Sequence, residues 1–237
     1  MTYERVLETR PEAKEKLHAF LIDLRKSVGL DDFVIGDTKL MESVNRKARD
    51  DYEGDHLAVL DHERGKGIVS DPLSVLKTKL QLSNPNSNLM LKHGAEIVTL
   101  NDLFENPKIK TGYRCINTKI ALPVGNAEPH TVEIQIVASQ IEDLYERTHE
   151  EINFARSIAE NARNREMTQD EKKLMAFAMA KCRYHNQKAS RDHGYDDLLD
   201  PRIHSKHALS STREDRMEAM LYQYEYQKTE YQKFILE

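Results

Sequence analysis

The sequence has no tryptophan, aromatic residues make up only 7% of it, and it holds two cysteines among its 237 residues. With so few aromatic rings, a hydrophobic core must be built mainly from aliphatic side chains. Cys115 and Cys182 stand far apart and lack the spacing of metal ligands. This argues against a disulfide framework or a cysteine-based zinc site, and it predicts two free thiols in a reducing compartment.

Long apolar runs are also absent. No stretch of the sequence approaches the ~20 apolar residues that a membrane-spanning helix needs, and the first residues lack the apolar segment of a secretory signal. We therefore expect a soluble, cytoplasmic protein with no membrane partner. The formal net charge of -5 argues against a surface that coats nucleic acid, although it is compatible with a local basic cleft.

Several familiar signatures are missing as well. The chain contains neither a Gly-Lys-Ser/Thr phosphate loop nor a Gly-x-Gly-x-x-Gly turn. Its Asp61-His62 dipeptide has no complementary His-Asp pair and no further ligands of a binuclear metal hydrolase. Any nucleotide chemistry must therefore use a different arrangement of residues.

The clearest positive signal is a pair of alternating segments, residues 115–122 and 130–136. Alternation of apolar and polar residues is typical of half-buried strands, and the connection between them holds Gly125 and two prolines, which favours an antiparallel hairpin. One face of this hairpin is predicted to be core. The other face carries the polar side chains of Tyr113, Asn117, Lys119, Glu133 and Gln135.

Upstream, residues 3–27 have the apolar spacing of an amphipathic helix. A second helix is predicted to begin at an N-cap in Gly36-Asp37-Thr38 and to run to about residue 50. On it, Lys39, Ser43 and Lys47 fall at i, i+4 and i+8 and share one stripe. A solvated helix face explains the same pattern.

Residues 56–61 are predicted to form a short buried strand that ends on Asp61, followed by a loop that holds Arg64, Lys66 and two glycines. A carboxylate at a strand end is a hard ligand for Mg²⁺, and glycines let backbone N–H groups approach phosphates. A surface turn explains the same residues, and without further context it is the simpler interpretation.

The remaining periodicity predicts a helix over residues 72–82 with Asp71 as its cap, a strand over residues 95–100, and helices from residue 141 onward. Thr168 and Glu171 have capping-box spacing, and residues 214–234 offer an apolar face for a core, a partner or an oligomer. We therefore expect an α+β fold: a mixed sheet of about five strands flanked by helices, with a C-terminal helical extension.

The order of the motifs resembles one family. Lys39-x-x-x-Ser43-x-x-x-Lys47, Asp61, Gly112-Tyr113-Arg114, the strand at 132–136 and His149 follow one another as in the synthetase domain of RelA/SpoT-like proteins. The resemblance covers about residues 37–155. It implies a synthetase domain over residues 1–165, a helical extension over residues 166–237, and transfer of pyrophosphate from ATP to the 3′-hydroxyl of a guanine nucleotide. It also implies self-association through the C-terminal helices.

The resemblance assigns roles to individual residues. Asp61 and Glu133 are expected to hold Mg²⁺, and Glu133 to assist deprotonation of the attacking hydroxyl, which needs a proton acceptor. Tyr113 is expected to stack on the acceptor base. The expected nucleotide-binding residues are Lys39, Ser43, Lys47, Arg64, Lys66, Tyr113, Arg114, Asn117, Gln135 and His149.

Some positions depart from the family pattern. Asp37 and Leu40 stand where the family has the arginine and the serine of an Arg-x-Lys-Ser motif, Asn117 stands where a histidine is common, and Val137 replaces an arginine. These changes, with the basic loop at 108–110, keep two alternatives open. One is a toxin of the same superfamily that modifies an adenine nucleotide or the 3′ end of tRNA. The other is an inactive module that binds nucleotides or proteins.

Overall fold

The computed structural model describes residues 3–108, 111–125 and 128–195. The chain divides into two compact units, residues 1–104 with 115–139, and residues 105–114 with 140–237. Each unit is treated separately below. None of the described helices combines the length and the hydropathy that crossing a membrane requires.

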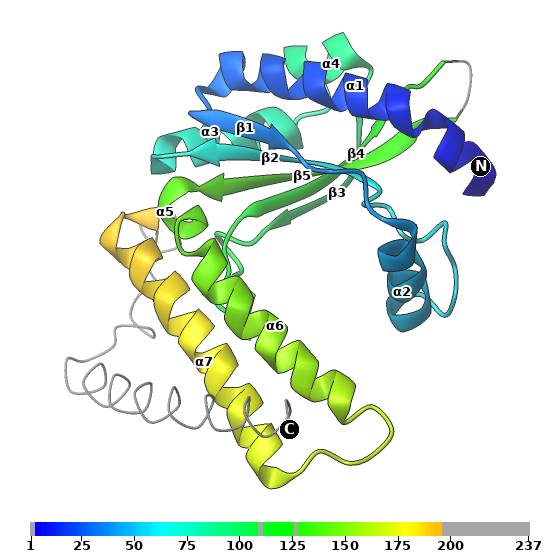
Figure 1. Cartoon of the computed structure of the whole chain (residues 1–237). Coiled ribbons are helices and arrows are strands. Elements are labelled where there is room, and N and C mark those ends of the chain that lie inside the picture. Colours follow the sequence, from blue (N-terminus) through cyan, green and yellow to red (C-terminus); the bar gives the residue numbers. More distant parts are fainter. Residues whose placement is uncertain (1–2, 109–110, 126–127, 196–237) are drawn as a thin grey trace. The chain divides into compact units, whose positions relative to one another are not determined.

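The first unit is built on a five-stranded mixed sheet with the strand order β1-β2-β5-β4-β3 (Figure 1). Strands β2 and β5 pair in parallel, and the other neighbouring pairs are antiparallel. The strands are β1 (Asp32–Ile35), β2 (Glu63–Val69), β3 (Glu96–Asp102), β4 (Ile116–Leu122) and β5 (His130–Ala138). The predicted α+β fold with a mixed five-stranded sheet is confirmed.

The predicted hairpin is β4 and β5. Its register pairs Lys119 with Glu133 and Asn117 with Gln135, so these side chains share one face of the sheet. The opposite face is apolar and fully buried at Ile116, Ile120, Leu122, Val132, Ile134 and Ile136. The two faces are therefore divided as the alternation predicts.

Helices α1 and α3 pack on the apolar side of the sheet, with α1 lying across it, and α4 packs against these two helices (Figure 1). The helices of this unit are α1 (Tyr3–Val28), α2 (Met41–Asp51), α3 (Pro72–Ser83) and α4 (Asn88–His93). Helix α1 approaches β2 closely: a Cβ atom on Gly65 would lie 2.5 Å from Cδ1 of the buried Leu21. A side chain at position 65 would therefore force α1 or Leu21 to shift.

That packing corrects the prediction of a loop after Asp61. Residues Glu63–Val69 form β2, and the apolar residues 56–60 before it form turns and irregular backbone, without a strand. Val59 of this segment packs against Val44 and Ala48 of α2. The apolar run at 56–60 therefore packs against helix α2, while the charged and glycine-rich stretch at 63–69 forms a strand of the sheet.

Two short elements carry little sequence signal. Strand β1 has only four residues at a sheet edge, and α4 has six. Helix α4 is set by its ends: the Ser87 side chain accepts a hydrogen bond from the Met90 N–H, and Gly94 closes the helix with φ of 55°. Helix α3 has the predicted Asp71 cap, which accepts from the Ser74 N–H.

The second unit contains a pair of helices, α6 (Tyr145–Asn161) and α7 (Gln169–Asp192), which follow the short α5 (Ser139–Glu142). Phe154 and Ile158 pack against Leu174 and Ala178. The capping box predicted at Thr168 and Glu171 is present. The predicted domain boundary after residue 165 falls between α6 and α7 and stays a prediction. Residues 214–234 and the oligomer expected from them lie outside the described residues.

Candidate functional site

The first cluster of the site is a carboxylate between two lysines. Lys47 Nζ lies 2.8 Å from Asp61 Oδ2, and Lys39 Nζ binds the same oxygen. The Asp61 side chain is only 9% exposed. Three residues that the sequence spreads over 23 positions therefore meet at the start of β2.

Lys39 reaches Asp61 from a different position than predicted. Helix α2 begins at Met41, and its N-cap is Leu40, without a side-chain cap. The predicted cap in residues 36–38 is therefore wrong, and Lys39 precedes the helix. Only Ser43 and Lys47 of the expected stripe are helical, and Ser43 makes no side-chain hydrogen bond within the described part of the chain.

A set of backbone and side-chain contacts holds the segment before α2. The Lys39 N–H donates to the His62 carbonyl over 3.2 Å, and Arg10 Nη2 donates to the Lys39 carbonyl over 2.9 Å. Arg10 also forms an ion pair with the buried Glu63, to which the Thr38 hydroxyl donates. These contacts fix the Lys39 backbone beside β2, so its side chain points to Asp61.

Burial alone would raise the pKa of Asp61, but the hydrogen bonds and charges of the two lysines outweigh it and lower that pKa to about 2. Burial lowers the pKa of Lys39 despite the attraction of Asp61. For Lys47, burial is outweighed by Asp61 and the charge of Glu133, and its pKa is raised. Asp61 is ionised throughout the physiological range.

This aspartate fits one position of a magnesium site. Its Oδ1 atom is buried and has no hydrogen-bond partner among the described residues. No group of three or more histidine, cysteine, aspartate or glutamate side chains suited to a metal occurs in that part of the chain. Mg²⁺ typically binds one or two carboxylates together with substrate phosphates and waters, so a single open oxygen is compatible with it.

The second cluster is centred on Glu133 in β5. Its Oε1 atom accepts hydrogen bonds from Asn117 Nδ2 and Gln135 Nε2, each over 2.7 Å. Glu133 is 8% exposed, and its Oε2 atom has no hydrogen-bond partner among the described residues. Asn117 and Gln135, predicted to bind nucleotide, thus first of all fix a carboxylate.

Basic side chains surround Glu133 on the same face. The register pairs Glu133 with Arg64 of β2 on one side and with Lys119 of β4 on the other, and it pairs Gln135 with Lys66. Lys119 is missing from the predicted nucleotide-binding residues. The alternation of β4 contains the signal for it, because every second residue from Asn117 shares the face of Glu133.

Tyr113, Arg114 of the same motif, and His149 belong to the second unit. The loop that carries Tyr113 is anchored on α7, where Asn186 Nδ2 donates to the Thr111 carbonyl over 3.0 Å. Gly112 has φ of 65°, and a Cβ atom there would lie 3.2 Å from the Arg183 carbonyl oxygen. A side chain at position 112 would be strained twice, by conformation and by space.

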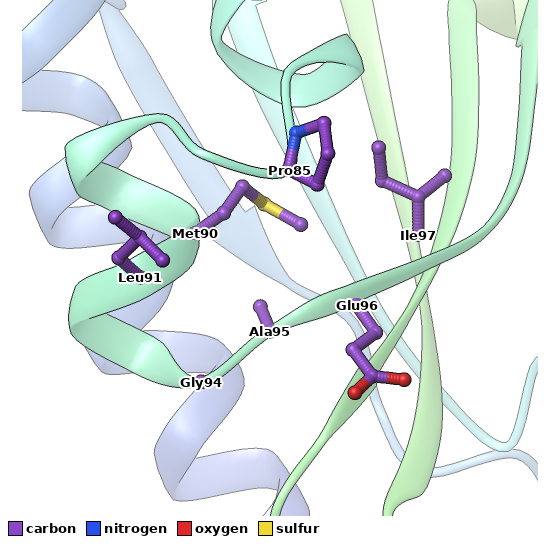
Figure 2. Close-up of a pocket in the computed structure, with 7 residues that line it drawn as sticks. All are labelled: Pro85, Met90, Leu91, Gly94, Ala95, Glu96 and Ile97. Carbon is purple, nitrogen blue, oxygen red and sulfur yellow. The ribbon is translucent and has the colours of Figure 1, made fainter.

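A pocket of about 520 Å³ lies elsewhere, between α4 and the start of β3. Figure 2 shows Pro85, Met90 and Ile97 facing the same space. None of the predicted site residues lines this pocket, and its only ionisable lining group is the carboxylate of Glu96. The candidate site is therefore the polar face of the sheet.

The mixed sheet with helices on one face and a charged opposite face defines an α+β scaffold of known type. It is similar to the small alarmone synthetase 1 from Bacillus subtilis bound to its product pppGpp, with a TM-score of 0.59 and 16% identity over 87% of this chain and 98% of that chain. A GTP pyrophosphokinase family protein from Streptococcus pneumoniae matches with a TM-score of 0.51 and 16% identity, covering 83% of this chain and 95% of that chain.

The Type VI effector Tas1, solved with its immunity protein, has 20% identity and a TM-score of 0.50, covering 80% of this chain and 96% of that chain. No protein-family model and no curated protein matches the sequence. The likeness of the structures nonetheless shows that the chain has the fold of a RelA/SpoT-like small synthetase domain. The fold implied by the motif order is thereby confirmed.

Proposed function

We propose that this protein is an ATP-dependent pyrophosphokinase that transfers pyrophosphate from ATP to the 3′-hydroxyl of a guanine nucleotide. The observation that carries the proposal is Glu133: two amides fix its Oε1, while Oε2 has no partner among the described residues. One neighbour in fold was solved with pppGpp, the product of that protein, which supports a guanine nucleotide as acceptor.

In the proposed reaction, the 3′ oxygen of the acceptor attacks the β-phosphorus of ATP. A bond forms between that oxygen and the β-phosphorus, the bond from the β-phosphorus to the oxygen bridging the α-phosphate breaks, and AMP leaves. Oε2 of Glu133 accepts the proton of that hydroxyl. A general base must lie within hydrogen-bond distance of the proton that it takes. Positioning and charge neutralisation supply most of the catalysis in phosphoryl transfer.

The basic residues near Asp61 are suited to the ATP phosphates. Lys39 and Lys47 surround Asp61, and Arg64 is exposed on the neighbouring β2. Mg²⁺, when bound, would neutralise phosphate charge and orient the phosphates, with Asp61 and Glu133 as its expected protein ligands. Asp61 also keeps the two lysine side chains in position before ATP arrives.

The test is an assay with ATP labelled in its terminal phosphates, Mg²⁺ and a panel of acceptors: GDP, GTP, AMP, ADP and tRNA. We expect label in GDP and GTP products, and a loss of roughly 100-fold or more in Glu133→Gln, since a general base contributes about 10²–10⁴ to the rate. Glu96→Gln is the matched control, because Glu96 is an exposed glutamate on the edge strand β3. Its activity should equal that of the wild type.

Other results would lead to the alternatives. Label found only in adenine products or in tRNA would favour the toxin. That alternative is supported by the asparagine at position 117 and by the fold shared with the Type VI effector. Nucleotide binding in calorimetry without transfer to any acceptor would favour an inactive module. Transfer that survives Glu133→Gln would overturn the role of Glu133.

A further inference from the structure

Lys119 is the basic residue of the site that no motif singles out. Its Cα atom pairs directly with that of Glu133 across the antiparallel ladder of β4 and β5. Side chains so paired have Cβ atoms ~4.5–5.5 Å apart on one face of the sheet. The side chain of Lys119 is half-buried, and a lysine in such a position typically packs its stem and keeps its ammonium group at the surface.

Despite this proximity, Lys119 and Glu133 form no ion pair. The carboxylate instead accepts hydrogen bonds from the amides of Asn117 and Gln135, which face each other two positions further along the ladder. Within the described residues Lys119 has neither an ion pair nor a hydrogen bond. Its charge is therefore available for a ligand that is bound next to Glu133.

The cations of the site divide by strand. Arg64 lies on β2, and Lys39 and Lys47 bind Asp61 just before that strand, so these three cations lie on one side of β5. Lys119 lies on β4, on the opposite side of β5. When the ATP phosphates bind to the cations on the β2 side, the ammonium group of Lys119 on the β4 side is left for the acceptor nucleotide.

The chemistry of the acceptor indicates which of its groups Lys119 meets. The 3′-hydroxyl and the 5′-carbon are attached to adjacent carbons of the ribose ring. A phosphate on the 5′-carbon therefore lies within reach of a lysine beside the residue that takes the 3′ proton. A lysine ammonium is a compact point charge on a flexible stem and binds phosphate without demanding one orientation.

We propose that Lys119 binds the phosphate on the 5′-carbon of the acceptor ribose, and so makes the enzyme prefer a nucleotide over the nucleoside. This inference rests on the proposed function and deepens it. It predicts a specificity that depends on the 5′-phosphate and not on the base, so it applies equally to GDP, to AMP and to the phosphodiester before a 3′-terminal adenosine.

The experiment compares each acceptor nucleotide with its nucleoside, beginning with GDP and guanosine, in wild type, Lys119→Gln and Lys119→Arg. We expect Lys119→Gln to raise the KM for GDP roughly 10-fold to 100-fold, the worth of a charge-assisted hydrogen bond, with kcat within about 3-fold. Values for guanosine should not change, and Lys119→Arg should keep most of the GDP affinity. Lys77→Gln, an exposed lysine on α3, is the control.

An equal loss for GDP and guanosine, or a loss in kcat alone, would overturn the inference, because Lys119 would then act through Glu133 or through the fold. Calorimetric titration of the same variants with GDP and guanosine separates this result from failure of the proposed function. If no acceptor is modified, but Lys119→Gln weakens the binding of GDP and not that of guanosine, the phosphate site is supported and the proposed transfer reaction is rejected. Equal binding of GDP to wild type and Lys119→Gln rejects the site.

Discussion

The carboxylate of Asp61 lies between two lysine side chains, which is an unusual electrostatic setting for an aspartate. Its carboxylate is largely buried and depends on Lys39 and Lys47 for its charge, and its pKa is lowered to about 2. A carboxylate whose pKa is lower in the folded than in the unfolded state stabilises the fold above the unfolded pKa. That contribution is lost as the pH falls toward the folded pKa.

Asp61→Asn should therefore lower the free energy of unfolding at pH 7 by about 2 kcal/mol, because the fold lowers the pKa of Asp61 from its ordinary 3.8 to about 2 and each pKa unit corresponds to about 1.4 kcal/mol. The difference between wild type and variant should shrink to about half at pH 3. Urea unfolding at several pH values measures it. Asp37→Asn, an exposed carboxylate in the segment before α2, is the control. A difference independent of pH would contradict the assignment.

The sequence pattern identified the two lysines of the Asp61 cluster, but it did not predict how the backbone holds them. The spacing of Lys39, Ser43 and Lys47 correctly associates the two lysines, but it assigns Lys39 to a helix that begins only at Met41. What holds Lys39 is the ion pair of Arg10 with Glu63, residues 53 positions apart. Contacts over such distances leave no periodic trace in the sequence, because periodicity reports only local structure.

Among the elements, the hairpin β4–β5 follows directly from its alternating sequence, whereas β2 does not. Strand β2 alternates between buried and less buried positions, but glycine occupies two of its buried positions. Glycine does not look apolar in the sequence, because neighbouring side chains fill the space beside it: Leu17 and Leu21 of α1 at Gly65, and Leu30 and Ile136 at Gly67. The sequence pattern predicted a strand in the apolar run at 56–60 instead, where the structure has none.

The packing of α1 on β2 can be tested at Gly65. Gly65→Ala should lower the free energy of unfolding by about 1–3 kcal/mol, the usual cost of overpacking a core, because the new methyl group collides with Leu21. Chemical denaturation of Gly65→Ala, Leu21→Ala and the double variant measures the coupling between the two positions. Because Leu21→Ala removes the colliding atoms, the double variant should lose less than the sum of the single losses. Strict additivity would show that the close approach does not limit position 65.

For the whole molecule, the distribution of charge favours a mononucleotide over tRNA as the acceptor. The chain carries 35 basic and 40 acidic residues, a net charge of -5, while cations gather around Asp61 and Glu133. A mononucleotide needs only such a local group of cations. A tRNA molecule carries many phosphates, and binding it tightly usually requires many lysine or arginine contacts, each of which makes the affinity more sensitive to salt.

We therefore expect a mixture of GDP and tRNA, at equal concentration and about 0.15 M salt, to receive label almost entirely in the mononucleotide, because the Debye length of ~8 Å screens the tRNA phosphates from distant cations. Lowering the salt to about 0.05 M should raise tRNA labelling only slightly, since few phosphate contacts give a shallow salt dependence. Gel and thin-layer separation of the same reactions measures both products. A steep rise in labelled tRNA at low salt, abolished by Glu133→Gln, would contradict the expectation and identify a basic surface that extends well beyond the residues around Glu133.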